Sequence, residues 1–250
     1  MEGSEALSPQ RARYPGRQPS EGASNHRRQH LCLFWDVKAN TMQYLKDSGF
    51  NILILGRWNP SIFSPQWVRA NVAGAGDEVM LALPIGNPAA PLRISFAGVQ
   101  LFTAPDFLEI KPSALDDASI DACARVADNI LALLSHTPIT AIGVNVRFED
   151  AAASTELDPL FLFPDQGLID PVKYPVISSS VARCFDLGQQ DLLNLTVTQQ
   201  KDNYVLEFNF HTDSQDIEVV RSRVSPNCVR RRLEQARDFL KDTYNATIEE

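Results

Sequence analysis

The stretch from Leu115 to Glu149 constrains the fold most, because it contains a complete helix-to-strand unit. Apolar residues recur every three or four positions from Ile120 to Leu134, which predicts a helix with one apolar face. Pro138 ends this helix, since its ring and missing N–H cannot continue the hydrogen bonding. From Ile142 to Phe148, apolar residues alternate with polar or small ones, which predicts a half-buried strand. The unit therefore predicts a helix packed against a sheet.

A fainter copy of this unit closes the chain. Ser113 and Asp116 fit a capping box before the first helix, and Ser225-Pro226 is a favourable start for a second amphipathic helix. A short strand with similar residues precedes each helix. We therefore expect an α+β protein with a mostly antiparallel sheet and two long amphipathic helices on one face. The similarity also suggests a divergent internal duplication, in which a strand–turn–strand–helix–strand unit is used twice.

Composition divides the chain into four segments. Residues 1–41 are rich in Ser, Pro, Gly and Arg, so we expect a disordered N-terminal tail that buries too little apolar surface to fold. Residues 42–150 and 179–250 form the first and second α+β halves. Residues 151–178 form a loop-rich crossing segment with several Asp-Pro and Pro-Asp turns. Its apolar run, Leu160 to Phe163, should pack against the body.

The chain is acidic, with a formal net charge of −8 at pH 7. The tail is rich in arginine, so the rest is more acidic still, which disfavours binding to nucleic acid. No apolar run is long enough to span a bilayer, and we expect no membrane association. The first thirty residues lack the apolar core of a secretory signal, and the cysteines have no metal-ligand spacing. We therefore expect free thiols and a cytoplasmic protein.

One catalytic candidate lies at the start of a predicted strand. Asp106, Glu109 and Lys111 resemble the PD-(D/E)xK signature of metal-dependent nucleases. The resemblance implies that two carboxylates hold a divalent cation while the lysine assists the attacking water. In that family the aspartate normally lies many residues earlier, on a separate strand, whereas here two residues separate it from the glutamate. The alternative interpretation is a hairpin turn followed by a strand with a polar outer face.

A first binding candidate is the tripeptide Arg57-Trp58-Asn59, which follows a buried strand and begins a turn. It resembles a recognition tip, because exposed Trp and Arg side chains are frequent anchors of protein interfaces. The alternative interpretation is that Trp58 covers one end of the core. The two interpretations differ in a measurable way, since an interface anchor is exposed in the free protein whereas a core residue is buried.

A second binding candidate is a basic cluster around the start of the last helix. Several arginines near a helix N-terminus can receive an acidic partner or a phosphate. The alternative interpretation is a solvated helix face with internal pairs between oppositely charged side chains. The proposed binding residues of this cluster are Arg221, Arg223, Arg230 and Arg231, and Arg232 lies beside them.

The sequence shows no convergent catalytic set beyond the candidate above. No two histidines have metal-ligand spacing, no G-x-S-x-G elbow is present, and no glycine-rich stretch has the length of a phosphate-binding fingerprint. We expect no cofactor and no bound metal. The favoured function is a cytoplasmic, non-enzymatic binding or assembly protein that acts through contacts with a protein partner. The alternatives are a metal-dependent hydrolase or nuclease that uses Asp106, Glu109 and Lys111, and a small-ligand-binding module.

Overall fold

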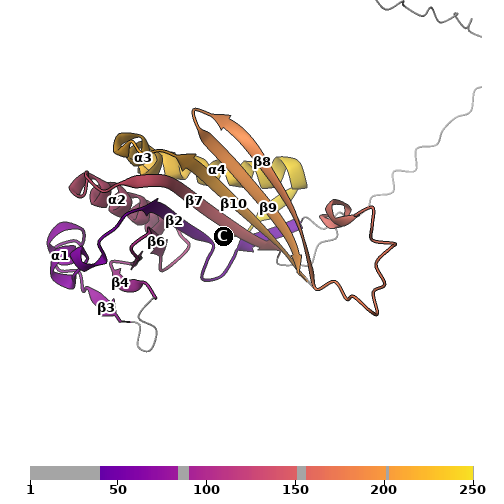
Figure 1. The fold of residues 1–250 in the computed structure, drawn as a ribbon, viewed down its shortest axis with the longest axis horizontal. Helices are drawn as coiled ribbons and strands as arrows, with labels where there is room; N and C mark the ends of the chain where they lie inside the picture. Colours follow the sequence, from indigo (N-terminus) through magenta and orange to yellow (C-terminus); the bar gives the residue numbers. More distant parts are fainter. Residues whose placement is uncertain (1–39, 84–89, 151–155, 201–202, 250) are drawn as a thin grey trace, which may run out of the picture. The chain divides into compact units, whose positions relative to one another are not determined.

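Eleven strands form one sheet in the part of the chain that the computed structural model describes, residues 40–83, 90–150, 156–200 and 203–249. The main path runs β3-β4-β5-β6-β2-β7-β10-β9-β8, and its long central and outer strands fan out in Figure 1. Neighbours along this path are antiparallel. The strands of the path are β2 (Phe50–Gly56), β3 (Met80–Ala82), β4 (Leu92–Phe96), β5 (Val99–Thr103), β6 (Phe107–Pro112), β7 (Ile139–Asp150), β8 (Ser178–Gly188), β9 (Asp191–Gln200) and β10 (Asn203–Asp213).

Two further strands bring both ends of the described chain together. β1 (Asn40–Tyr44) pairs in parallel with β11 (Ala246–Ile248), and it also pairs with the end of β7. Met42 is completely buried in this arrangement. The boundary predicted between the tail and the first half therefore falls inside a strand, because residues 40 and 41 belong to β1. The rest of the predicted disordered tail, residues 1–39, lies outside the described residues.

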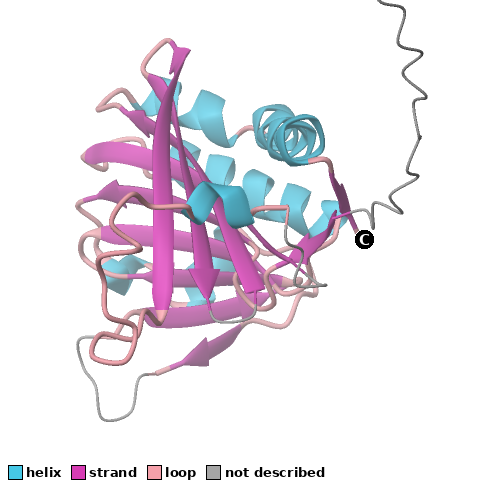
Figure 2. Cartoon of the chain, turned by 90° about the vertical axis from the view of Figure 1, so that its right-hand side faces the viewer, coloured by secondary structure: helices cyan, strands magenta, loops and turns pink. Residues whose placement is uncertain are grey.

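The predicted α+β class is confirmed, with the long helices on one face of an antiparallel sheet. α2 (Asp117–Leu133), α3 (Ile217–Val224) and α4 (Pro226–Tyr244) lie together on this face, as Figure 2 shows. Their apolar stripes enter the core, where Ile130 is fully buried and Leu233 nearly so. Shorter elements are α1 (Pro65–Asn71) and the 3-10 helices η1 (Pro60–Ile62) and η2 (Asp158–Phe161). Hydrophobic burial of these stripes against the strands is the main favourable term for such a layered fold.

The helix starts differ in detail from the prediction. The cap of α2 is Asp116 rather than Ser113, and its Oδ1 accepts a hydrogen bond of 2.8 Å from the Ser119 amide. The Ser119 hydroxyl also donates to Asp116. The two hydrogen bonds from Ser119 lower the pKa of Asp116, because they stabilise the charged carboxylate. α4 begins directly after Ser225 as predicted, although the Ser225 hydroxyl donates to the Ser222 carbonyl instead of capping the helix.

The internal duplication is not confirmed. The strand after α2 is β7, which has 12 residues and occupies the middle of the sheet. The strand after α4 is β11, which has 3 residues and pairs with β1. The two units therefore end in strands with different lengths and different places in the sheet.

Candidate functional site

The nuclease-like residues do not converge on a metal site. Glu109 and Lys111 lie on one face of β6 as predicted, and their side chains form an ion pair of 3.1 Å. Asp106 is exposed in the turn before the strand, where its backbone carbonyl accepts a hydrogen bond from the Gly56 amide. Glu109 also accepts a hydrogen bond from the buried amide of Asn51. Within the described residues, no group of three or more His, Cys, Asp and Glu side chains could hold a metal ion.

The structure places Trp58 in the core, so it is not the exposed anchor that a recognition tip requires. Its side chain is 5% exposed, and the indole Nε1 donates to the Ile54 carbonyl at 3.2 Å. The Trp58 ring also packs beside Phe63. Arg57 and Asn59 are exposed on either side, and Asn59 caps η1 by accepting a hydrogen bond from the Ser61 amide.

Most of the basic cluster is occupied by internal ion pairs. Arg221 on α3 pairs with Asp128 on α2 at 2.9 Å, and Arg230 on α4 pairs with Asp121 on α2. Arg231 is exposed and directs a guanidinium nitrogen toward the Cys228 sulfur at 3.5 Å. These contacts tie the helices to one another, which corresponds to the alternative interpretation of the cluster. Anion binding there stays a prediction for Arg231.

Arg223 and Arg232 meet at a carboxylate that the sequence analysis missed. Asp191 begins β9 and accepts hydrogen bonds from Arg223, Arg232 and the Thr212 hydroxyl. Burial alone would raise the pKa of Asp191, but the bonds from Thr212 and Arg223 and the charge of Arg232 outweigh it, so the pKa lies below its usual value. The guanidinium of Arg232 also lies over the Phe210 ring at 5.1 Å. The site is an electrostatic anchor that joins the β8–β9 hairpin to α3 and α4.

A row of asparagines crosses the face of the sheet opposite the helices. Asn51, Asn145, Asn209 and Asn194 are paired in register across β2, β7, β10 and β9. Hydrogen bonds of 3.0 and 2.6 Å join Asn194 to Asn209 and Asn209 to Asn145. The sequence gives no local signal for this row, because its members come from four separate strands. These bonds satisfy part of the hydrogen-bonding capacity of three amides, whereas Asn51 donates to Glu109 and its buried Oδ1 has no partner in the described structure.

The crossing segment and β8 form the most exposed apolar part of the described chain. More than half of the exposed large hydrophobic side chains lie between Leu162 and Ile177. Val172 is 91% exposed and Ile177 is 84% exposed. β8 follows directly and pairs with β9 on one side, while no described strand pairs with its other side. A large apolar patch beside an unpaired strand is typical of an interaction surface.

The start of the crossing segment is anchored, although the predicted packing of Leu160 to Phe163 is only partly correct, because Leu162 and Phe163 are exposed. Leu157 and Phe161 are buried, and the Phe161 ring lies 5.5 Å from that of Tyr204 on β10. The Tyr204 hydroxyl donates a hydrogen bond to Asp158. Burial, together with this acceptor, raises the pKa of Tyr204 to about 12. The exposed remainder of the segment therefore leaves from a fixed point.

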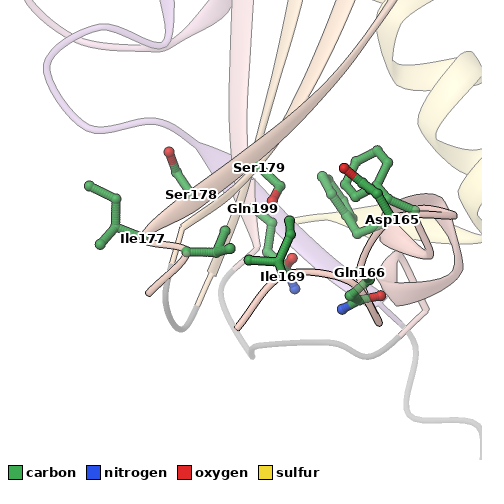
Figure 3. A pocket seen from close by; sticks show the side chains of 10 residues that line it. Asp165, Gln166, Ile169, Ile177, Ser178, Ser179 and Gln199 are labelled. Carbon is green, nitrogen blue, oxygen red and sulfur yellow. The ribbon is translucent and has the colours of Figure 1, made fainter. Parts of the chain in front are cut away.

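A pocket of about 490 Å³ separates this anchored turn from the start of β8. Figure 3 shows Ile169 and Gln199 near its centre, with Ser178 and Ser179 of β8 on one side and Asp165 and Gln166 on the other. Its remaining walls are apolar and are formed by Phe161, Phe163, Val176 and Ile177. The pocket has no charged side chain other than Asp165, which suits apolar contacts better than chemistry.

Comparisons with protein-family models and with curated proteins found no match to this chain. No helix of the described residues combines the length and apolar character needed to cross a membrane. The candidate site comprises β8 and the exposed crossing segment, Leu162 to Ile177.

Proposed function

We propose that this chain is a non-enzymatic assembly protein that associates with a second copy of itself through β8 and the exposed crossing segment. The observation that carries the proposal is the open edge of β8, an 11-residue strand with one described neighbour. An edge strand presents a row of unpaired N–H and C=O groups, which another strand can pair with. Proteins that stay monomeric usually protect such edges with proline, lysine, shortness or a covering loop.

β8 carries little of this protection. Between Ser178 and Leu187 it contains neither proline nor lysine, and its charged residues are Arg183 and Asp186. A shift in pairing register at its end, between Asp186 and Gly188, leaves most of the strand regular. Its unpaired edge is therefore suited to adding another strand.

A second copy fits this edge because antiparallel pairing around a two-fold axis is self-complementary. Paired residues then lie on the same face of the joined sheet. With the axis at Ala182, this small residue faces its own copy, Ile177 comes opposite Leu187 of the second copy, and Ser178 comes opposite Asp186 of the second copy. With the axis at Arg183, two like charges would be opposite each other, which is unfavourable. We therefore place the axis at Ala182.

The same arrangement covers apolar surface at both ends of β8. The crossing segment leads into the first residue of β8, while Leu187, which is also exposed, lies at the far end of the strand. Antiparallel pairing brings the beginning of one β8 next to the end of the other. Val176 and Ile177 of each copy thus lose water contact against the second copy, and this burial favours association.

Localisation in the cytoplasm belongs to the same proposal. Cys184 is a free, exposed thiol on β8, and such thiols persist in a reducing compartment. Cys123 is a free thiol inside the core, and burial raises its pKa to about 12, so it stays protonated and unreactive.

The proposal is tested by measuring molar mass in solution with light scattering during size-exclusion chromatography. The wild-type chain should be a dimer at micromolar concentration, and Ala182→Lys should be a monomer, because two lysines would meet at the axis. Ala182 is exposed, so the variant should stay folded and should melt at the same temperature as the wild-type chain diluted to a monomer. A monomeric wild-type chain, or a dimer that Ala182→Lys leaves intact, would overturn the proposal.

Cysteine cross-linking tests the position of the axis separately. In a background with Cys32→Ser and Cys184→Ser, Ala182→Cys should form a disulfide-linked dimer under mild oxidation, because paired Cα atoms in antiparallel strands lie about 4.5–5.5 Å apart. The background variant without Ala182→Cys is the matched control and should give no cross-link, since the remaining cysteines, Cys123 and Cys228, are buried. Efficient cross-linking of the wild-type chain through Cys184 would move the axis to that residue.

A further inference from the structure

We propose that a second pocket, at the other end of the sheet from β8, binds a phosphate group of a small molecule. The pocket has a volume of about 420 Å³, within the range of small-ligand sites. It lies between the turn that joins β1 to β2, the strands β4 to β6, and the residues that precede α2. Its polar lining residues include Lys46, Asp47, Arg93, Gln100, Lys111 and Ser113.

Three cations from three separate elements line this pocket. Lys46 belongs to the β1–β2 turn, Arg93 to β4 and Lys111 to β6, and Asp47 is the single carboxylate among the lining residues. The lining is thus positively charged, although the whole chain carries a net charge of −8. A concave cluster of one sign concentrates its potential and attracts counter-ions more strongly than scattered surface charges do.

The pairing of these cations leaves positive charge available. Within the described residues, neither Lys46 nor Arg93 forms an ion pair. Lys111 pairs with Glu109, so the excess positive charge comes from Lys46 and Arg93, against Asp47 as the one lining carboxylate. The pocket therefore holds more positive than negative charge, and a bound anion would balance the excess.

One aromatic ring, Phe102 on β5, contacts two of the cations. The Arg93 guanidinium carbon and the Lys111 nitrogen lie 5.9 and 5.3 Å from the centre of the Phe102 ring. Cation–π attraction fixes both groups on the face of the sheet opposite the helices. Positive charges held on one face of the sheet repel one another, and a bound anion relieves this repulsion.

The chemistry of these groups favours a phosphate over a carboxylate. Arginine binds the tetrahedral oxyanion through two N–H groups, and lysine adds point charges. A phosphate group presents three terminal oxygens, enough to meet all three cations at once, whereas a carboxylate presents two. Ser113 and Gln100 add neutral hydrogen-bonding side chains to the same walls.

The test is titration calorimetry of the full chain with pyrophosphate and with inorganic phosphate at low ionic strength, where screening is weak. Binding should be saturable and should raise the melting temperature. Arg93→Ala should weaken the affinity at least tenfold, and Arg93→Lys should restore part of it. Arg69→Ala removes an exposed arginine on α1 and is the matched control, which should bind like the wild-type chain.

Two results would overturn the site. One is the absence of saturable binding of either anion, and the other is an equal loss in Arg69→Ala and Arg93→Ala, which would show non-specific charge attraction. The Ala182→Lys variant should bind pyrophosphate with unchanged affinity, because β4 to β6 and β8 lie at opposite ends of the strand order. The phosphate site and the self-association thus succeed or fail independently.

Discussion

The two ends of the sheet expose apolar side chains in similar ways but differ in the backbone they offer. β3 exposes Met80 and Leu81, yet it is 3 residues long and pairs with β4 alone. β8 is 11 residues long and is joined to an exposed apolar segment. A short edge offers few hydrogen-bonding groups to a partner, whereas a long regular edge offers a full ladder. The comparison shows that exposed apolar side chains mark an interface best when unpaired backbone lies beside them.

The two ends also differ in how they are anchored. The β8–β9 hairpin is fixed to the helices by Asp191 and its two arginines, whereas β3 carries no charged side chain. An edge that must accept a partner benefits from a fixed position, because pre-ordering lowers the entropy cost of association.

Removing the anchor should have the largest effect on stability. Arg232→Ala leaves the buried carboxylate of Asp191 with one arginine, and breaking a buried ion pair typically costs about 3–5 kcal/mol. Urea unfolding should show a loss of this size. The control is Arg230→Ala, whose ion pair with Asp121 is partly exposed and should contribute less than about 1 kcal/mol. Equal losses in the two variants would show that Asp191 is not a special anchor.

Replacing an apolar side chain of the proposed interface should weaken self-association without unfolding the chain. Ile177→Ser should raise the dimer dissociation constant about a hundredfold, since both copies lose a buried aliphatic side chain and each loss costs about 1.5 kcal/mol. Ile177 is exposed in the single chain, so the melting temperature of the diluted monomer should not change. Sedimentation velocity over a concentration series measures the dissociation constant. An unchanged constant would show that the crossing segment is not part of the interface.

Acidification should loosen the β8 end of the sheet through Asp191. Its pKa is lower in the folded chain than the usual value of about 3.9, so its contribution to stability is present above that value and is lost as pH falls through the folded pKa. The free energy of unfolding, measured from neutral pH down to about pH 3, should fall more steeply in the wild type than in Asp191→Asn. The same pH dependence in both proteins would show that the Asp191 carboxylate does not cause the loss of stability in acid.

The smallest effect is expected at the opposite edge. Leu81→Lys on β3 replaces a partly exposed side chain, so we expect a change in stability within about 0.5 kcal/mol. The variant should keep the dimeric mass of the wild type. Loss of the dimer in Leu81→Lys would mean that β3, rather than β8, forms the interface.

Local patterns in the sequence were enough to predict the elements but not their neighbours. The stripe around Ile130 predicted α2, and the alternation around Val144 predicted β7, because periodicity reports which side of an element is buried. The place of β2 between β6 and β7 could not be predicted, since it depends on pairing between distant segments. For the same reason nothing in β8 itself indicated that it would be an edge.

The candidate residues show the same limit. Glu109 and Lys111 were placed correctly on one face of β6, but the bond from Asn51 to Glu109 joins residues far apart in sequence. The arginine cluster was visible, whereas its carboxylates, such as Asp191, come from other elements. The charge of the arginines alone cannot distinguish a binding surface from an internal network of ion pairs. The difference depends on whether carboxylates from other elements already pair with them.

The asparagine row has a consequence for how the strands find their alignment. A one-residue slip would turn an amide toward the helices and an apolar side chain toward water, so each slip is penalised at every strand the row crosses. Gly143 also restricts the register of β7 against β10, since a Cβ at this position would lie 2.8 Å from the side-chain amide nitrogen of Asn209. The row ends at Asn194, which is opposite Cys184 on β8. The asparagine row thus specifies the register of the inner strands, while the register of the outer edge of β8 depends on the side chains of the second copy that pairs with it.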